Sequence, residues 1–200
     1  MNPVPLRGKQ VRAVVFDVGE TLVDETSMWT RVAQAGGVTP FTMMAGLGAT
    51  IALGRPHDDV WGLLGIEQPA GTWTMDDWYP DALPCVARLR EAGYGVFAAA
   101  NIPADAEDAL RPHFDGVASA AGWGVWKPDA AFFERVVGLA GIPAARIAYV
   151  GDRVDNDVVP ALRAGMVAVH VRRGPWGHLQ QPPGGAIRIR SLDMVPEALP

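Results

Sequence analysis

Two aspartates follow apolar, strand-like runs at distant points of the 200-residue chain. Asp17 comes directly after Val14-Val15-Phe16, and Asp152 comes directly after Val150-Gly151. Apolar runs rich in β-branched and aromatic residues are typical of strands buried on both faces of a parallel sheet. Ligands bind at the carboxyl edge of such sheets. An acid here can also simply begin a turn, but the repeated order of strand, acid and helix favours two carboxylates that share one cation.

Further polar residues lie near the expected ends of strands or the expected starts of helices. They are Thr21, Asn101, Lys127 and Asp157. Asn101 follows a strand-like run, and Lys127 comes just before a helical pattern. Pro160 lacks a backbone donor and is harmless only in the first turn of a helix, so the sequence predicts a helix that begins near Asp157. We therefore expect Asp157 at a helix start beside Asp152.

Strand-like and helical patterns alternate along most of the chain. Strands are expected at 14–16, 94–100, 116–119, 146–150, 166–171 and 187–189, and helices at 81–91, 104–110, 129–140, 157–164 and 195–199. This alternation predicts an α/β fold, a parallel sheet with helices on both faces. Segments 120–126 and 174–185 are expected to be loops, and the second is long enough to be functional or disordered.

Residues 25–80 differ from the rest of the chain in their pattern, because they contain no strand-like run. Helical pieces are expected at 27–35, 40–53 and 57–64, with Pro40 in a first turn. We therefore expect a helical cap at 25–80, inserted into a core formed by 1–24 and 81–200. The tryptophans Trp29, Trp61, Trp73 and Trp78 fall in this cap, where we interpret them as packing residues in preference to a substrate pocket.

Composition excludes several classes of protein. The net charge is −5, the pI is about 5.3 and no long run of Lys or Arg occurs, so no nucleic-acid partner is expected. No apolar run is long enough for a membrane span or a signal peptide. The single cysteine, Cys85, cannot form an internal disulfide and is interpreted as a packing residue. These features predict a protein of the reducing cytoplasm.

The order of these motifs resembles the haloacid dehalogenase-like (HAD) hydrolase superfamily, in its phosphatase-like branch with a small helical cap. The matching residues are Asp17 and Thr21, then Asn101, then Lys127-Pro128, and finally Gly151-Asp152 with Asn156-Asp157. They span nearly the whole chain. The resemblance implies a Rossmannoid core, and a small phosphorylated metabolite as the substrate.

The resemblance also implies roles for these residues. Asp17 would be the nucleophile that forms an aspartyl phosphate, which water then hydrolyses. Mg²⁺ would be bound by Asp17, Asp152 and the backbone carbonyl of Gly19. Asp157 would orient metal-bound water or Lys127.

Three further residues would act on charge and orientation. Lys127 would neutralise the negative charge of the nucleophile and the phosphate, while Thr21 and Asn101 would donate hydrogen bonds to Asp17 or to phosphoryl oxygens.

Two positions depart from the family pattern. Family phosphatases carry a second Asp two residues after the nucleophile, where this chain has Gly19, and a Ser or Thr where it has Ala100. Loss of the acid is expected to slow expulsion of an alkoxide by about 10² to 10⁴ and to leave a weak activity. Glu20 could supply a carboxyl, although a solvent-facing Glu20 is the simpler expectation. Arg172 and Arg173 follow a strand and could reach a substrate anion, but a solvated pair is again simpler.

Three functions remain open from the sequence. The first is a Mg²⁺-dependent phosphohydrolase that acts best on activated phosphates such as aryl or acyl phosphates. The second is a 2-haloacid dehalogenase, whose branch lacks the second Asp but needs no metal, so that Asp152 and Asp157 argue against it. The third is a noncatalytic relative that binds a phosphorylated ligand or a protein partner.

Overall fold

The computed structural model describes residues 10–69 and 77–200. Its described part is built on one six-stranded parallel sheet, with the strand order β3-β2-β1-β4-β5-β6. The strands are β1 (Ala13–Phe16), β2 (Gly95–Ala100), β3 (Gly116–Ser119), β4 (Ile147–Gly151), β5 (Val167–Val171) and β6 (Ile187–Ile189). The predicted α/β fold with a parallel sheet is confirmed.

Strand β1 lies at the centre of the sheet, between β2 and β4, and all four of its residues are buried. Side chains alternate between the two faces of a strand. Val14 and Phe16 therefore pack in one hydrophobic cluster and Val15 packs in another. A strand buried on both faces needs the continuous apolar run that the sequence shows.

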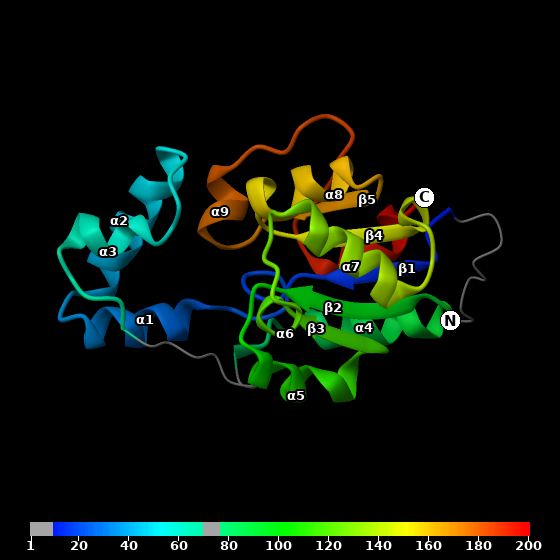
Figure 1. Cartoon of the computed structure of the whole chain (residues 1–200), viewed down its shortest axis with the longest axis horizontal. Coiled ribbons are helices and arrows are strands. Elements are labelled where there is room, and N and C mark those ends of the chain that lie inside the picture. Colours follow the sequence, from blue (N-terminus) through cyan, green and yellow to red (C-terminus); the bar gives the residue numbers. More distant parts are fainter. Residues whose placement is uncertain (1–9, 70–76) are drawn as a thin grey trace.

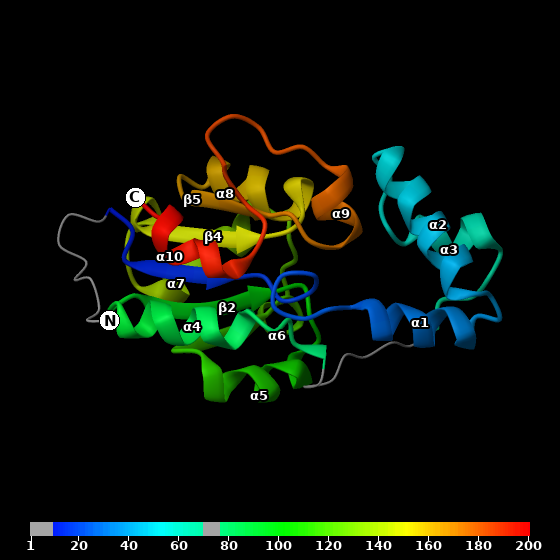
Figure 2. The ribbon, with the colours of Figure 1, turned by 180° about the vertical axis from the view of Figure 1, so that it is seen from behind.

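Helices cover both faces of the sheet. One cluster joins β1 to α4 (Ala82–Glu91), α5 (Glu107–Leu110) and α10 (Val195–Ala198), and the other joins it to α7 (Ala130–Ala140) and α8 (Val159–Arg163). Figure 1 views the side with α7 and α8, and Figure 2 shows α4 and α10 from behind. Cys85 packs in the α4 layer, where burial raises the pKa of its thiol to about 12, so it remains a protonated packing residue.

Helices α1 (Thr26–Ala35), α2 (Pro40–Ala52) and α3 (Asp59–Leu64) lie beyond the carboxyl ends of β2 and β4 (Figures 1 and 2). We call them the cap helices. Their bounds follow local signals, because Thr39 Oγ1 accepts from the Thr42 amide at the start of α2 and Gly65 is left-handed at the end of α3. Each begins within two residues of the predicted position.

The cap helices enclose a small hydrophobic cluster of their own. Trp29 and Trp61 stack there with ring centroids 6.0 Å apart, and Trp176 is the one buried member that comes from outside residues 26–64. Trp78 instead packs against the His113 ring at the sheet, with centroids 5.5 Å apart. Trp73 lies outside the described residues. Packing thus accounts for Trp29, Trp61 and Trp78, although Trp29 and Trp61 also line the cavity described below.

Two expected loops contain helices. Segment 120–126 begins with α6 (Ala120–Trp123), whose first turn is capped by Ser119 Oγ. Segment 174–185 begins with α9 (Gly174–Leu179), which packs on α2 through Trp176. Gly and Pro suggested a loop at 174–185, but burial of an indole against the cap helices stabilises a helix there.

The remaining described residues form turns, short 3₁₀ segments and one π turn. Every helix in residues 10–69 and 77–200 is too short or too polar to span a lipid bilayer.

Candidate active site

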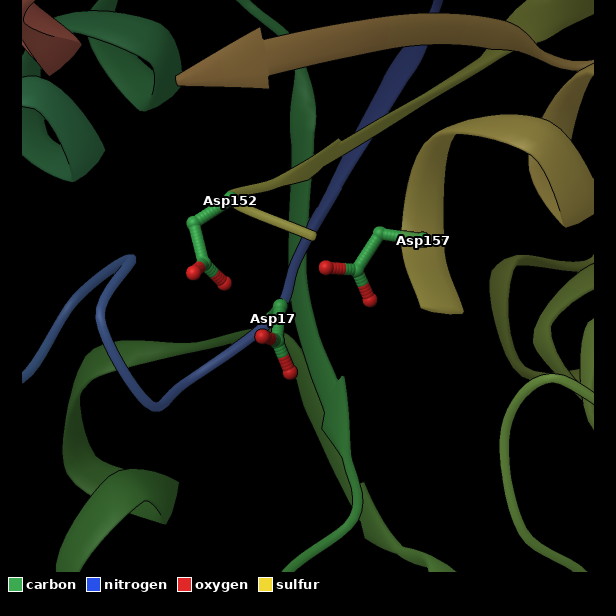
Figure 3. Close-up of side chains that lie close together, drawn as sticks. All are labelled: Asp17, Asp152 and Asp157. Carbon is green, nitrogen blue, oxygen red and sulfur yellow. The ribbon is translucent and has the colours of Figure 1, made fainter. Parts of the chain in front are cut away.

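Three buried aspartates meet at the carboxyl edge of the sheet. Asp17 follows β1, Asp152 follows β4, and Asp157 lies in the turn before α8. One carboxylate oxygen from each lies within 4.8 Å of the others, and Figure 3 shows the three carboxylates facing a common space. The parallel pairing of β1 with β4 brings the first two together, because it aligns Phe16 with Val150.

The helix after Asp152 begins earlier than the sequence indicated. Val154–Val158 forms a π turn that precedes α8, and the amides of Asp157 and Val158 both donate to the Arg153 carbonyl. After the wide turn, Val158 and Ala161 are buried in the cluster that covers this face of the sheet, and Leu162 packs against that cluster in part. π turns are frequent at functional sites, and this one carries Asp157.

Two backbone features hold the Asp157 carboxylate in place. A Cβ atom on Gly151 would lie 2.4 Å from the Asp157 carboxyl carbon, so only glycine leaves room for it. The Arg153 amide donates to Asp157 Oδ2 at 3.0 Å. Gly151, which precedes Asp152, therefore leaves the space that the Asp157 carboxylate occupies.

Lys127 joins two of the three aspartates. Its Nζ lies 2.6 Å from Asp17 Oδ1 and 2.6 Å from Asp157 Oδ1, and its side chain is 2% exposed. Burial alone would lower the pKa of Lys127, but the charges of Asp157 and Asp17 raise it well above the usual value. Lys127 is therefore a fixed positive charge within the cluster.

One lysine does not balance the negative charge of the cluster. Burial and the neighbouring Asp157 and Asp17 raise the pKa of Asp152 well above its usual range, and burial raises the pKa of Asp157 to about 6. Asp152 Oδ2 is buried and has no hydrogen-bond partner among the described residues. Convergent oxygen ligands with excess negative charge suit Mg²⁺, so the residues present fit the expected ion.

Within the described residues, the side chains of Asn101 and Thr21 form no hydrogen bond with the three aspartates. The Asn101 amide is bonded to the backbone of Lys127, because Oδ1 accepts from Lys127 N at 2.8 Å and Nδ2 donates to Lys127 O at 3.1 Å. Thr21 is fully buried and its Oγ1 has no partner in the described part of the chain. Asn101 thus positions Lys127, whereas the Thr21 hydroxyl retains an unused donor.

Glu20 is not solvent-facing, in contrast to the simpler expectation. It is buried with a φ of 50°, its Oε1 accepts from the Glu25 amide at 3.0 Å, and its Oε2 accepts from the Tyr79 hydroxyl at 2.6 Å. Burial raises the pKa of the Glu20 carboxyl. Both oxygens are therefore already engaged in holding the loop after β1.

Arg173 is also not a solvated side chain. Its guanidinium pairs with Asp81, donates to the Thr21 carbonyl at 2.8 Å and lies over the Tyr79 ring, 4.0 Å from the centroid. Asp81 in turn accepts from Ser191 Oγ and the Leu192 amide. Arg173 therefore ties the loop after β1 to the core, and the expectation of a solvated arginine pair is wrong for this residue.

Glu25 is a residue of the site that sequence reasoning missed. It was assigned only as the first residue of the cap, yet it lines the same cavity as Asp17 and Gly19. Burial and the nearby charge of Glu20 raise the pKa of Glu25 to about 7, and Asp17 also raises it. The missing carboxyl at position 19 was the sequence signal that another acid could be needed.

A cavity of about 680 Å³ opens between the aspartates and the cap helices. Asp17, Asp152 and Lys127 lie in its wall. Arg153 and His57 provide further polar groups, and the apolar part of the wall includes Met28, Trp29, Val32, Trp61, Ile102 and Trp176. The Arg153 guanidinium lies 4.9 Å from the Trp176 ring centroid. This volume is that of a small-molecule site.

Comparisons with known proteins match this chain to one superfamily. A family model described as haloacid dehalogenase-like hydrolase matches residues 11–165. The glyceraldehyde 3-phosphate phosphatase of Methanocaldococcus jannaschii is 34% identical over 83 residues, which are 42% of this chain and 36% of that protein. The chain spans only about a third to a half of the length of the curated relatives that it matches.

Solved structures with different activities in their names share this fold. A HAD phosphatase from Thermococcus onnurineus is 20% identical with a TM-score of 0.62, covering 94% of this chain and 97% of its own. An L-2-haloacid dehalogenase from Xanthobacter autotrophicus is also 20% identical, with a TM-score of 0.66 and the same coverage. At this identity the likeness concerns the fold, so the chemistry must be argued from the site.

Proposed function

This chain belongs to the haloacid dehalogenase-like hydrolases, and from that premise we propose that it hydrolyses small phosphorylated metabolites through a covalent intermediate on Asp17. One observation carries the proposal: buried Lys127 donates to both Asp17 and Asp157 beside Asp152, whose Oδ2 has no partner in the described chain. A buried cluster of this kind, with more carboxylates than cations, supports binding of a divalent ion and a phosphate at this edge of the sheet.

Lys127 would orient the nucleophile. Its ammonium group holds Asp17 Oδ1, so that Oδ2 is the oxygen available for in-line attack on phosphorus. The same ammonium group offsets negative charge on the phosphoryl oxygens, and Asn101 keeps the Lys127 backbone in place. The Thr21 hydroxyl could donate to Asp17 or to the phosphate when substrate is present.

The expected Mg²⁺ would be held by the carboxylates of Asp17 and Asp152 and by the backbone carbonyl of Gly19, a residue that lines the same cavity. When bound, it would offset repulsion between these carboxylates and an approaching phosphate. Asp157 would keep Lys127 in position, through the bond of 2.6 Å between them. Because Gly19 has no side chain, this set of residues alone favours substrates whose leaving group needs no proton.

The cavity indicates the class of substrate. Its volume of about 680 Å³ accommodates a small phosphomonoester, and its wall away from the aspartates carries indole and aliphatic side chains. Relatives named as a glyceraldehyde 3-phosphate phosphatase and a sesquiterpene phosphatase match parts of this chain. We propose that the phosphate faces Asp17 while the organic part packs toward Trp29 and Trp61.

Phosphate release from a panel of phosphorylated metabolites, with p-nitrophenyl phosphate as the aryl reference, tests this proposal. We expect turnover that requires Mg²⁺, stops with EDTA and is lost in Asp17→Asn. Chloride release from chloroacetate without metal would instead favour a dehalogenase. Absence of both reactions, with phosphate binding retained, would favour a noncatalytic binding protein.

A further inference from the structure

The side-chain position of residue 19 is filled by another residue. A Cβ atom built on Gly19 would lie 2.3 Å from Oε1 and 2.9 Å from the carboxyl carbon of Glu25. A side chain at position 19 would therefore occupy the space that the Glu25 carboxyl occupies. Gly19 is compatible with this arrangement because it leaves that space empty.

The loop after β1 explains how Glu25 reaches this place. The chain folds back tightly, because the amides of Leu22 and Val23 donate to the Val18 carbonyl and the Glu20 amide donates to the Val23 carbonyl. The Glu25 amide is then held by Glu20 Oε1 at 3.0 Å. The loop thus brings Glu25 into contact with Gly19, which lies six residues earlier in the sequence.

The Glu25 carboxyl is oriented as well as placed. Trp29 Nε1 donates to Glu25 Oε2 at 3.3 Å, which leaves Oε1 as the oxygen beside Gly19. Glu25 and Asp17 line the same cavity. Glu20, which the sequence offered as a less simple alternative for this carboxyl, has both oxygens engaged by the Glu25 amide and by Tyr79.

We propose that Glu25 supplies the acid–base carboxyl for which position 19 has no side chain, an inference that rests on the proposed phosphatase function. In the first step Asp17 attacks phosphorus, the bond from phosphorus to the leaving oxygen breaks, and that oxygen takes the proton of the Glu25 carboxyl. In the second step the Glu25 carboxylate takes a proton from water, the water oxygen attacks phosphorus, and the bond to Asp17 breaks. Asp17 and Glu25 return to their starting states and phosphate leaves.

This role predicts different effects on two kinds of substrate. Glu25→Gln retains an oxygen that can accept from Trp29 but removes the transferable proton. With glyceraldehyde 3-phosphate, whose alkoxide must be protonated, we expect kcat/KM to fall by about 10² to 10⁴. With p-nitrophenyl phosphate the first step needs no acid, so we expect a burst of about one nitrophenol per enzyme followed by slow turnover of the intermediate.

A relocation variant tests the same idea in the opposite direction. Gly19→Asp combined with Glu25→Ala removes the obstructing side chain and restores an acid from position 19. We expect this double variant to hydrolyse glyceraldehyde 3-phosphate at least about tenfold faster than Glu25→Ala alone, as recovery of part of an acid–base contribution would require. Glu134→Gln, an exposed change of the same kind on α7, is the matched control and should retain wild-type rates.

The possible results separate this inference from the function on which it rests. Three results would overturn the role of Glu25: an equal loss of kcat/KM on both substrates without a burst, no loss of kcat/KM in Glu25→Gln, or no faster hydrolysis in the relocation variant. In each case, wild-type activity that depends on Asp17 would still uphold the phosphatase function. Wild-type turnover of the aryl ester alone would also overturn the role of Glu25. A wild type that releases no phosphate from either substrate would overturn both.

Discussion

Replacing Lys127 by methionine should destabilise the fold mainly by leaving buried carboxylates without their partner. Lys127 is 2% exposed and bonds Asp17 and Asp157 at 2.6 Å each. Removal of one member of a buried ion pair typically costs about 3–5 kcal/mol. Methionine keeps most of the volume, so loss of packing adds little.

Protonation sets an upper limit to this cost. A carboxylate that loses its partner can take up a proton, and for an Asp with an unfolded pKa near 3.9 this costs about 5 kcal/mol at pH 7.5 but only about 2 kcal/mol at pH 5.5. The loss in free energy of unfolding should therefore shrink as the pH falls.

Urea unfolding followed by tryptophan fluorescence, with EDTA present, measures this loss. We expect Lys127→Met to lower the unfolding free energy by about 3–5 kcal/mol at pH 7.5, and Lys127→Met with Asp157→Asn to recover a large part of it. Arg135→Met, which removes an exposed cation from α7, is the control and should change stability by less than about 0.5 kcal/mol. A loss below about 1 kcal/mol, or one that does not vary with pH, would refute the reasoning.

Three further predictions follow from the same structure. Saturating Mg²⁺, at about one hundred times its dissociation constant, should raise the unfolding free energy of the wild type by about 2.7 kcal/mol and leave Asp152→Asn unchanged; calorimetric uptake by the variant equal to the wild type would contradict the assignment. Because burial raises the pKa of Glu25 from 4.5 to about 7, its contribution to stability is present below pH 4.5 and is lost as the pH rises to about 7. Urea unfolding in EDTA should therefore show that the free energy of unfolding falls less over this pH range in Glu25→Gln than in the wild type. An equal fall in both proteins would contradict this prediction. Trp176→Ala should lower stability by about 3–5 kcal/mol because this buried indole joins α9 to the cap helices, whereas Trp126→Ala, at a 54% exposed position, should change it little.

The sequence was sufficient for the sheet and for the ends of several helices. Strands such as β1 and β4 are buried on both faces, so burial demands an uninterrupted apolar run that is visible without the structure. Helix ends depend on local chemistry, as at Thr39 and Gly65, where a hydroxyl cap and a left-handed glycine act within a few residues. The parallel topology then brings Asp17 and Asp152 to one edge.

The structure decided what depends on contacts between distant segments. The helix at 174–179 forms where its Trp176 meets the cap helices, and the Arg173 side chain is largely shielded from solvent because Asp81 and Tyr79 lie against it. None of these partners is a neighbour in sequence. Local patterns therefore indicated a loop and a solvated cation.

The candidate site shows the same division. The sequence alone indicated Asp17, Lys127, Asp152 and Asp157, because strand ends and helix starts place them and those elements have local signatures. It did not indicate that Glu25 fills the space beside Gly19, since that depends on how the loop after β1 folds back against Glu20 and Trp29. Periodicity identifies which elements form, whereas the path of an irregular loop is fixed only by the side chains that pack around it in three dimensions.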